Sequence, residues 1–352
     1  MLINNYYHQI CIIIILINRG LSKRRASISP ETSWNQTGVT IVGSPNGIPG
    51  SSLSELRNPL GLAITDDDDV LYVGDTFNHR VVAIHLDSTR KNVAFGSGPG
   101  PKHDQFNRSH DVSIVDKSIY VLDTQNCRIQ KLMLDGSNPT TVLNYNRSWW
   151  SMYFFIDNDR NIYLSVLSEQ KVLLFQADSK VYTTVAGTGT LGPNNNQFRY
   201  PYGIFVDDSR TIYIADRWNH RIMKWSRNAK TGIRVAGDGT SGTALTRLNA
   251  PSYVVLDQKD YMYIVDGDNH RIIRWAFNSN VGICIAACAG TSGATPTQLN
   301  NPHALIFDSI GSLYVAEWDN NRVQKFQNLP FPSNDRLQTS NRSFVFRVFS
   351  FL

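Results

Sequence analysis

The sequence contains little of what several common classes of protein require. It has four cysteines among 352 residues, too few for a module with two zinc ions, which needs about eight ligands. Its longest apolar run, residues 10–17, is far shorter than the roughly 20 residues of a membrane-spanning helix. It has no Walker loop, no nucleophile elbow and no dinucleotide-binding glycine motif between a strand and a helix. Zinc modules of the RING type, P-loop enzymes and α/β-hydrolases are therefore excluded.

The formal charge of +5 is concentrated at the two ends of the chain. Residues 38–330 hold 27 basic and 27 acidic side chains, so this central part is neutral. A protein that binds nucleic acid usually carries its basic surface on the folded body. The charge distribution therefore does not favour a nucleic-acid partner.

The cysteines do not suggest a disulfide framework. Cys284 and Cys288 lie in a segment that reads as a strand. A fully extended chain places them about 13 Å apart, too far for a disulfide unless the strand is bulged. We therefore expect no disulfide and interpret the cysteines as small, buried apolar residues.

The ends of the chain differ in composition from its centre. The apolar run at 10–17 resembles the core of a signal peptide, but no basic residue precedes it and Lys23-Arg24-Arg25 follows it. A secretory leader, a short signal-anchor and a cytosolic start all remain open. We expect residues 1–33 to form a poorly ordered leader, with membrane contact only through its apolar segment. Residues 331–352 then form a C-terminal tail.

A short pattern recurs along the centre of the chain: an apolar stretch with a tyrosine, then an acid, then Asn-x-Arg. The tyrosines that mark its copies, the third of which is degenerate, are Tyr72, Tyr120, Tyr163, Tyr213, Tyr263 and Tyr314. A period of about 50 residues with strand-like units is typical of a radial repeat. Residues 38–330 are therefore predicted to form a single architecture.

The fourth copy shows what one unit contains. Residues 204–207, 211–216 and 221–225 read as three strands separated by tight polar turns, and 182–187 supplies the last strand of the unit before it. Four antiparallel strands repeated radially make a β-propeller blade. The prediction is an all-β protein with a six-bladed β-propeller of four-stranded antiparallel blades.

The ends of the repeat region predict how the ring closes. The sixth unit lacks a fourth strand of its own, whereas residues 38–43 have the form of such a strand with no blade before them. Their sequence, Gly-Val-Thr-Ile-Val-Gly, matches Gly-Ile-Arg-Val-Ala-Gly at 232–237. We expect this N-terminal strand to complete the last blade, which removes two open sheet edges.

These units resemble the NHL repeat, whose signature reads here as Asn-His-Arg at 78–80, 219–221 and 269–271. The resemblance covers about residues 38–327 and implies the propeller fold. It does not choose a function. Propellers of this family act as RNA- or protein-binding platforms in ubiquitin-ligase proteins, and they also occur in bacterial sensor kinases, extracellular adhesion proteins and peptide-amidating lyases.

The second and third units depart from the family pattern. The third has Val166 in place of the acid and Glu169-Gln170-Lys171 in place of Asn-His-Arg, and it opens on Ser148-Trp149-Trp150-Ser151. The second opens on Ser109-His110-Asp111. Blades 2 and 3 are therefore predicted to be the part of the ring that differs most from the common repeat structure.

The repeated acids and arginines are interpreted as structural. Each acid lies five residues before an arginine across one tight loop, so a charge-assisted hydrogen bond between them is expected. The pairs are Asp75 and Arg80, Asp123 and Arg128, Asp216 and Arg221, Asp266 and Arg271, and Glu317 and Arg322.

Two histidines outside the repeat pattern, His110 and His303, fall near the starts of first strands, where they would surround the mouth of the central channel. Catalytic zinc needs about three protein ligands, and the sequence offers no convincing third. We therefore expect no metal, no cofactor and no assigned catalytic residue. A metal-dependent lyase resembling the amidating enzymes, or a hydrolase, stays an alternative.

We predict a non-enzymatic binding or scaffold propeller, secreted or lumenal, with a cytoplasmic location as the alternative. A protein, peptide or glycan ligand is expected, and RNA is the main alternative partner; we expect a monomer. The binding face carries the Asp-x-x-Asn loops and the long connections, because antiparallel order places both on one side. Exposed Trp, Tyr and Arg are common anchors of interfaces. The predicted binding residues are Phe77, His110, Gln125, Trp149, Trp150, Tyr202, Arg217, Trp218, Asp268, His303 and Trp318.

Overall fold

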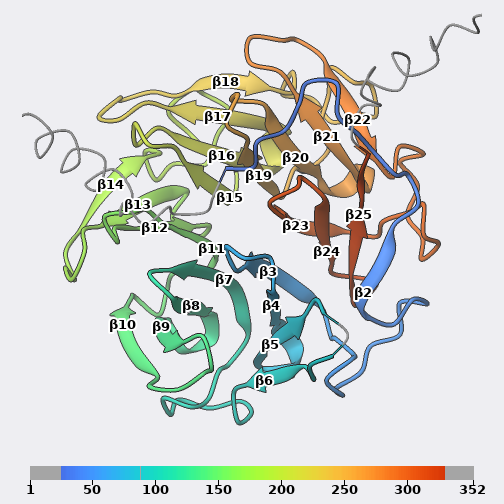
Figure 1. Cartoon of the computed structure of the whole chain (residues 1–352). Coiled ribbons are helices and arrows are strands. Elements are labelled where there is room, and N and C mark those ends of the chain that lie inside the picture. The colour runs from blue at the N-terminus through green and yellow to red at the C-terminus, as the bar shows by residue number, and fades with distance from the viewer. Residues whose placement is uncertain (1–24, 88, 330–352) are drawn as a thin grey trace, which may run out of the picture.

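The computed structural model describes residues 25–87 and 89–329, which form six four-stranded antiparallel sheets arranged in a ring (Figure 1). Each sheet is one blade. In the first five blades the four strands follow the chain from the inner to the outer strand. The predicted six-bladed all-β propeller is therefore confirmed.

The strands of the first three blades alternate with short turns. Blade 1 contains β3 (Pro59–Ile64), β4 (Val70–Asp75), β5 (Arg80–His85) and β6 (Val93–Phe95). Blade 2 contains β7 (Ser109–Val115), β8 (Ser118–Asp123), β9 (Arg128–Met133) and β10 (Thr140–Asn144). Blade 3 contains β11 (Ser151–Ile156), β12 (Ile162–Val166), β13 (Lys171–Phe175) and β14 (Tyr182–Ala186).

The remaining blades repeat this order. Blade 4 contains β15 (Pro201–Val206), β16 (Ile212–Asp216), β17 (Arg221–Trp225) and β18 (Ile233–Ala236). Blade 5 contains β19 (Tyr253–Leu256), β20 (Met262–Asp266), β21 (Arg271–Trp275) and β22 (Gly282–Ala286). Blade 6 contains β23 (Pro302–Phe307), β24 (Leu313–Glu317), β25 (Arg322–Phe326) and, from the other end of the chain, β2 (Val39–Gly43).

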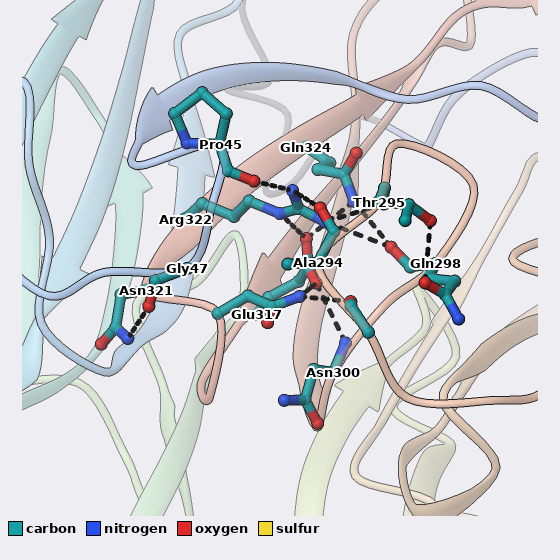
Figure 2. A network of polar contacts seen from close by, with 12 residues as sticks. Pro45, Gly47, Ala294, Thr295, Gln298, Asn300, Glu317, Asn321, Arg322 and Gln324 are labelled. Carbon is teal, nitrogen blue, oxygen red and sulfur yellow. Dashed lines mark hydrogen bonds and ion pairs between the residues drawn. The ribbon is translucent and has the colours of Figure 1, made fainter.

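The ring closes through the N-terminal strand, as the sequence predicts. In Figure 1, β2 (blue) lies beside β25 (red), and Val39 is paired with Lys325 in the antiparallel register. The segment after β2 adds to the closure, because Arg322 Nη1 donates to the carbonyl oxygen of Pro45 at 2.9 Å (Figure 2). Asn321 Nδ2 also donates to the Gly47 carbonyl oxygen at 2.9 Å.

The segment before β2 also packs against the propeller. β1 (Ser33–Trp34) pairs with β26 (Asn328–Leu329) in a small separate sheet. Ile28 is 1% exposed, and the Trp34 indole nitrogen donates to the Gly311 carbonyl oxygen at 2.9 Å. The apolar run at 10–17 and the tail 331–352 lie outside the described residues, so the limits of leader and tail stay predictions. Within the part of the chain that is described, no helix is long and apolar enough to cross a membrane.

The expectation of no disulfide is wrong, because Cys284 and Cys288 are bonded with their Cα atoms 5.6 Å apart. Two departures from an extended strand bring them together. The β21–β22 register shifts between Ile272 and Ile273, which marks a bulge. Ala287 then adopts a left-handed conformation, at φ 53°, and turns the chain back towards Cys284.

The hydrophobic core lies largely between neighbouring blades. Phe155 on β11 and Phe205 on β15 meet with ring centroids 5.5 Å apart, so blades 3 and 4 pack through aromatic contacts. The sheets twist and present β-branched and aromatic residues on both faces, as buried central strands do. The packed blades form a rigid ring that fixes the loops on its two faces.

Two faces of the ring are distinguished below. The loop-rich face carries the turns between second and third strands and the connections between blades. The hairpin face carries the turns between first and second strands.

Candidate functional site

Each repeat acid accepts hydrogen bonds at the start of the loop that it opens. Asp216 Oδ2 accepts from Arg221 Nε and from Asn219 Nδ2, both at 2.8 Å, and its Oδ1 accepts from the Arg199 backbone N–H at 2.7 Å. The equivalent acid–arginine pairs lie 2.6–2.8 Å apart: Asp75–Arg80, Asp123–Arg128, Asp216–Arg221, Asp266–Arg271 and Glu317–Arg322.

The same arginines hold the connection that leads into their own blade. Arg221 donates to the carbonyl oxygens of Pro193, Asn194 and Gln197, all within the connection 187–200. Figure 2 shows the equivalent contacts of Arg322 with Ala294 and Thr295. We call the acid, the asparagine and the arginine of one blade a clasp. A clasp gives the carbonyl groups of a long, irregular connection charge-assisted donors.

In five of the six blades, the residue just before the third strand's first residue links its blade to the next one. His220 Nδ1 accepts from the backbone N–H of Ala250 at 3.1 Å, across the boundary between blades 4 and 5. The same bond is accepted by His79 from Arg108, by Gln170 from Tyr200, by His270 from Asn301 and by Asn321 from Asn58. These five acceptors share a left-handed backbone conformation.

Burial lowers the pKa of the three histidines among these acceptors. A neutral imidazole can accept a hydrogen bond at Nδ1, whereas an imidazolium cannot. The repeat histidines therefore serve as uncharged acceptors between blades.

In the described part of the chain, the junction between blades 2 and 3 has neither a clasp nor a side-chain acceptor at the position that His220 holds in blade 4. Residues 145–150 alone join β10 to β11, less than half the length of the connection 187–200. Blade 3 accordingly has Val166 and Lys171 where blade 4 has Asp216 and Arg221. Within the described residues, the thiol of Cys127, which stands at the acceptor position of blade 2, has no hydrogen-bond partner and is free.

The short connection leaves a groove of about 830 Å³ on the loop-rich face. Trp150 on its rim is 47% exposed, and Trp149 meets Tyr182 edge to face at 5.2 Å between ring centroids. Arg108 and Arg147 line the groove, and neither forms an ion pair among the described residues. None of the described residues lining the groove is an acid, so it is positive as well as aromatic.

The predicted binding residues fall into two groups. Gln125, Trp149 and Trp150 lie together in the groove. Most of the others contact one another, and we call these the channel group: Phe77, Tyr202, Arg217, Trp218, Asp268, His303 and Trp318. Arg217 stacks over Tyr202 at 4.6 Å and donates to Asp268 at 3.1 Å. Trp318 contacts Phe77 at 5.6 Å and His303 at 5.3 Å between ring centroids, and Trp218 is 42% exposed beside Arg217.

The two histidines singled out as weak metal candidates are buried. Burial lowers the pKa of His110 to about 3 and that of His303 well below its usual range. His303 Nδ1 lies 2.9 Å from the Tyr153 hydroxyl. Residues 25–87 and 89–329 contain no group of three or more side chains arranged to hold a metal ion.

The sequence did not identify Arg108, Arg147 or Cys127 as members of the site. The signal that points to them is the distance along the chain between blades, since the third blade follows the second after an unusually short connection. Arg108 also has a positive φ of 61° and stacks over Phe77 at 4.8 Å. Its side chain therefore joins the groove to the channel group.

Comparison with known proteins supports the repeat and the fold. The sequence profile described as NHL repeat matches residues 198–225, and no curated protein matches the chain. A structural genomics protein of unknown function from Bacteroides thetaiotaomicron superposes with a TM-score of 0.68 at 16% identity, covering 85% of this chain and 77% of that one.

Two further solved structures have assigned roles. An auxiliary nutrient binding protein from Bacteroides thetaiotaomicron has a TM-score of 0.61 at 14% identity, over 88% of this chain and 76% of that one. Virginiamycin B lyase from Staphylococcus aureus has a TM-score of 0.56 at 11% identity, over 84% and 99%. At such identities the likeness is one of fold alone, and a propeller fold serves both binding proteins and enzymes.

Proposed function

We propose that this chain, which is a six-bladed β-propeller containing an NHL repeat, is a non-enzymatic binding protein that holds a protein, peptide or glycan in the groove between blades 2 and 3. The observation that carries this proposal is the pair of tryptophans beside Arg108 and Arg147 with no acid in the lining. Tryptophan and arginine are the side chains that most often dominate binding energy at interfaces.

The chemistry of the groove favours an anionic ligand with a flat or apolar part. Arg147 is exposed on the rim and Trp150 presents nearly half of its surface. Guanidinium groups bind carboxylates and sulfates through paired hydrogen bonds, and an indole ring stacks on an apolar face. Acidic glycans and acidic peptides combine these two features.

The free thiol of Cys127 provides a direct test, because it lines the groove. In a full-length Cys11→Ser background, the rate at which a maleimide modifies Cys127 would be measured with heparin, hyaluronan, a neutral glucan and a poly-glutamate peptide. We expect at least one anionic polymer to slow modification about fivefold or more. Trp149→Ala with Trp150→Ala should abolish the protection.

The matched control is Trp218→Ala, which removes an exposed tryptophan from blade 4 of the same face. It should leave the protection intact. If no polymer in the panel protects the thiol, or if the Trp218 variant loses protection equally, the groove is not the binding site.

RNA is the second candidate, because single-stranded nucleic acid also binds to grooves that combine arginines with aromatic rings. A single-stranded RNA titrated at several salt concentrations separates the two. Binding that weakens steeply with salt, and that Arg108→Gln with Arg147→Gln removes, would replace the glycan or peptide ligand by RNA.

The lyase or hydrolase alternative depends on His110 and His303. Elemental analysis of the purified protein tests it, because a metal enzyme would carry about one equivalent of metal that His110→Gln with His303→Gln releases. The Cys284–Cys288 disulfide supports a secreted or lumenal location, since disulfides persist mainly in oxidising compartments. Alkylation without reduction should modify neither of these cysteines in protein taken from its native source.

A further inference from the structure

The central channel ends on the hairpin face in a cavity of about 810 Å³. The last residues of the inner strands β3, β7, β19 and β23 form its walls, and the N-terminal segment Arg25–Ser27 closes one side. The cavity is thus at the other end of the propeller from the groove. Its volume lies within the range of typical sites for small molecules, roughly 300–1,000 Å³.

The walls of this cavity are apolar. Side chains from five blades take part, among them Leu62, Ile64, Ile114, Phe205, Leu305 and Phe307. Ile64, Ile114 and Phe307 are only partly buried by the protein. Apolar surface that the described residues leave uncovered inside a cavity favours binding of an apolar ligand that removes it from water.

The mouth of the cavity is acidic. The turn after β3 places Asp66, Asp67 and Asp68 there, the turn after β7 adds Asp116, and Asp308 follows β23. Hydrogen bonding from the Thr65 hydroxyl lowers the pKa of Asp67, which favours its charged form.

Two cations line the cavity, and one of them already has a partner. Arg25 forms an ion pair with Asp260 at 2.9 Å and lies over the Phe205 ring at 5.5 Å. Lys117, in the turn after β7, is the second. Asp308 is buried and already paired with Lys325 at 3.0 Å. The four carboxylates of Asp66, Asp67, Asp68 and Asp116, against Lys117, therefore leave a negative field at the opening of an apolar chamber.

We propose that this cavity binds a small organic cation, with its apolar body among the inner-strand side chains and its ammonium or similar group at the mouth carboxylates. The chemistry favours this class over the other simple classes of ligand. An organic anion would be repelled at the mouth, and a hydrated metal ion would leave the apolar walls uncovered. A neutral apolar ligand would make no use of the carboxylates.

Three probes that share a phenylalkyl body and differ in the charge of the head group test the proposal on the full-length protein: 4-phenylbutylammonium, 4-phenylbutanol and 4-phenylbutanoate. Binding would be measured by ligand-detected NMR at low salt. We expect the ammonium ion to bind about tenfold more tightly than the alcohol, which corresponds to about 1.4 kcal/mol, and the carboxylate not to bind. Added salt should reduce this preference, because the carboxylates of Asp66, Asp67 and Asp116 are solvent-exposed.

Two variants locate the binding. Asp66→Asn with Asp116→Asn changes exposed turn residues and should weaken the ammonium ion about fivefold while leaving the alcohol unchanged. Ile114→Trp fills the chamber and should remove both. Trp150→Ala, in the groove on the other face, should change neither, so this result is independent of the function proposed above.

Four outcomes would overturn the proposal. These are equal binding of the three probes, absence of binding by all three, an Asp66/Asp116 variant that binds the ammonium ion as well as the original chain does, and calcium that displaces the probe at equal concentration. The last would show a divalent-cation site at the mouth instead.

Discussion

Blades 3 and 4 are neighbours with the same strand order and the same register between their central strands, yet they differ in what holds them. Ser165 on β12 pairs with Val172 on β13 as Ala215 on β16 pairs with Ile222 on β17. Blade 4 has a full clasp, whereas blade 3 has none. A clasp is therefore not needed to build a blade.

The difference shows what a clasp does. Every clasped blade receives a long connection from the blade before it, and the clasp supplies donors to that connection. Blade 3 receives only residues 145–150, and at the position of its clasp acid Val166 is fully buried instead. Blade 3 therefore combines a missing clasp with a short connection, and the groove is lined by residues of that connection.

Replacing the basic residue at equivalent positions of blades 4 and 3 by methionine should give the largest difference between the two blades. Arg221→Met leaves Asp216 buried without its cation, and we expect a loss of about 3–5 kcal/mol in the free energy of unfolding. Lys171→Met at the same place in blade 3 should cost less than about 0.5 kcal/mol. Urea unfolding of both variants measures the difference, and equal losses would show that the clasp does not hold the connection.

The next largest effect is expected in the pH dependence of stability, to which the linking histidines contribute and the linking Gln170 of blade 3 does not. The pKa of His79, His220 and His270 is lowered in the folded protein, so the unfolded chain binds protons first as the pH falls. Their stabilising contribution is present above about pH 6.5, the ordinary histidine value, and is lost as the pH falls towards the lower folded-state values. Gln170 makes the same bond in blade 3 without titrating.

Replacing the three histidines by glutamine should therefore flatten the pH dependence of the melting temperature between pH 7 and 5. The loss of stability over this range should shrink by on the order of 1 kcal/mol, the size of one net hydrogen bond. His110 and His303, whose pKa is also lowered in the folded protein, are present in both proteins, so some dependence remains. An unchanged slope would mean that the repeat histidines do not accept these bonds.

The smallest effect is expected at the acceptor position of blade 2. Cys127→His restores the residue found in blades 1, 4 and 5, but the short connection offers it no backbone donor like that of Ala250. We expect the free energy of unfolding to change by less than about 0.5 kcal/mol. A gain of about 1 kcal/mol or more in thermal or urea unfolding would show that a donor is within reach.

Much of the fold could be predicted from the sequence, because it depends on local patterns that repeat. The recurring Tyr, acid and Asn-x-Arg set the number of blades. The similarity of residues 38–43 to 232–237 identified the closing strand, since both alternate apolar residues between glycines. Because the pattern recurs six times, the period can be recognised even though the third copy is degenerate.

What could not be predicted depends on backbone irregularity and on contacts between distant residues. The disulfide needed a bulge in β22 and a left-handed Ala287, a conformation that a non-glycine residue seldom adopts. The groove depends on how far a connection reaches over the loop-rich face, so Arg108 and Arg147 had no local signal. The binding role of the predicted face residues stays a prediction, and packing among Tyr202, Arg217 and Trp318 was not visible in the sequence.

Closure by the N-terminal strand has a consequence for how the chain is made. Val39 pairs with Lys325, so β2 leaves the ribosome long before its partner exists. At about 5–20 residues per second, translation takes roughly 15 to 60 s to reach β25. During that time the first strand presents an unpaired edge to the cell, a surface that invites aggregation. Five blades can be completed as the chain emerges, but the ring can close only after β25 has been synthesised.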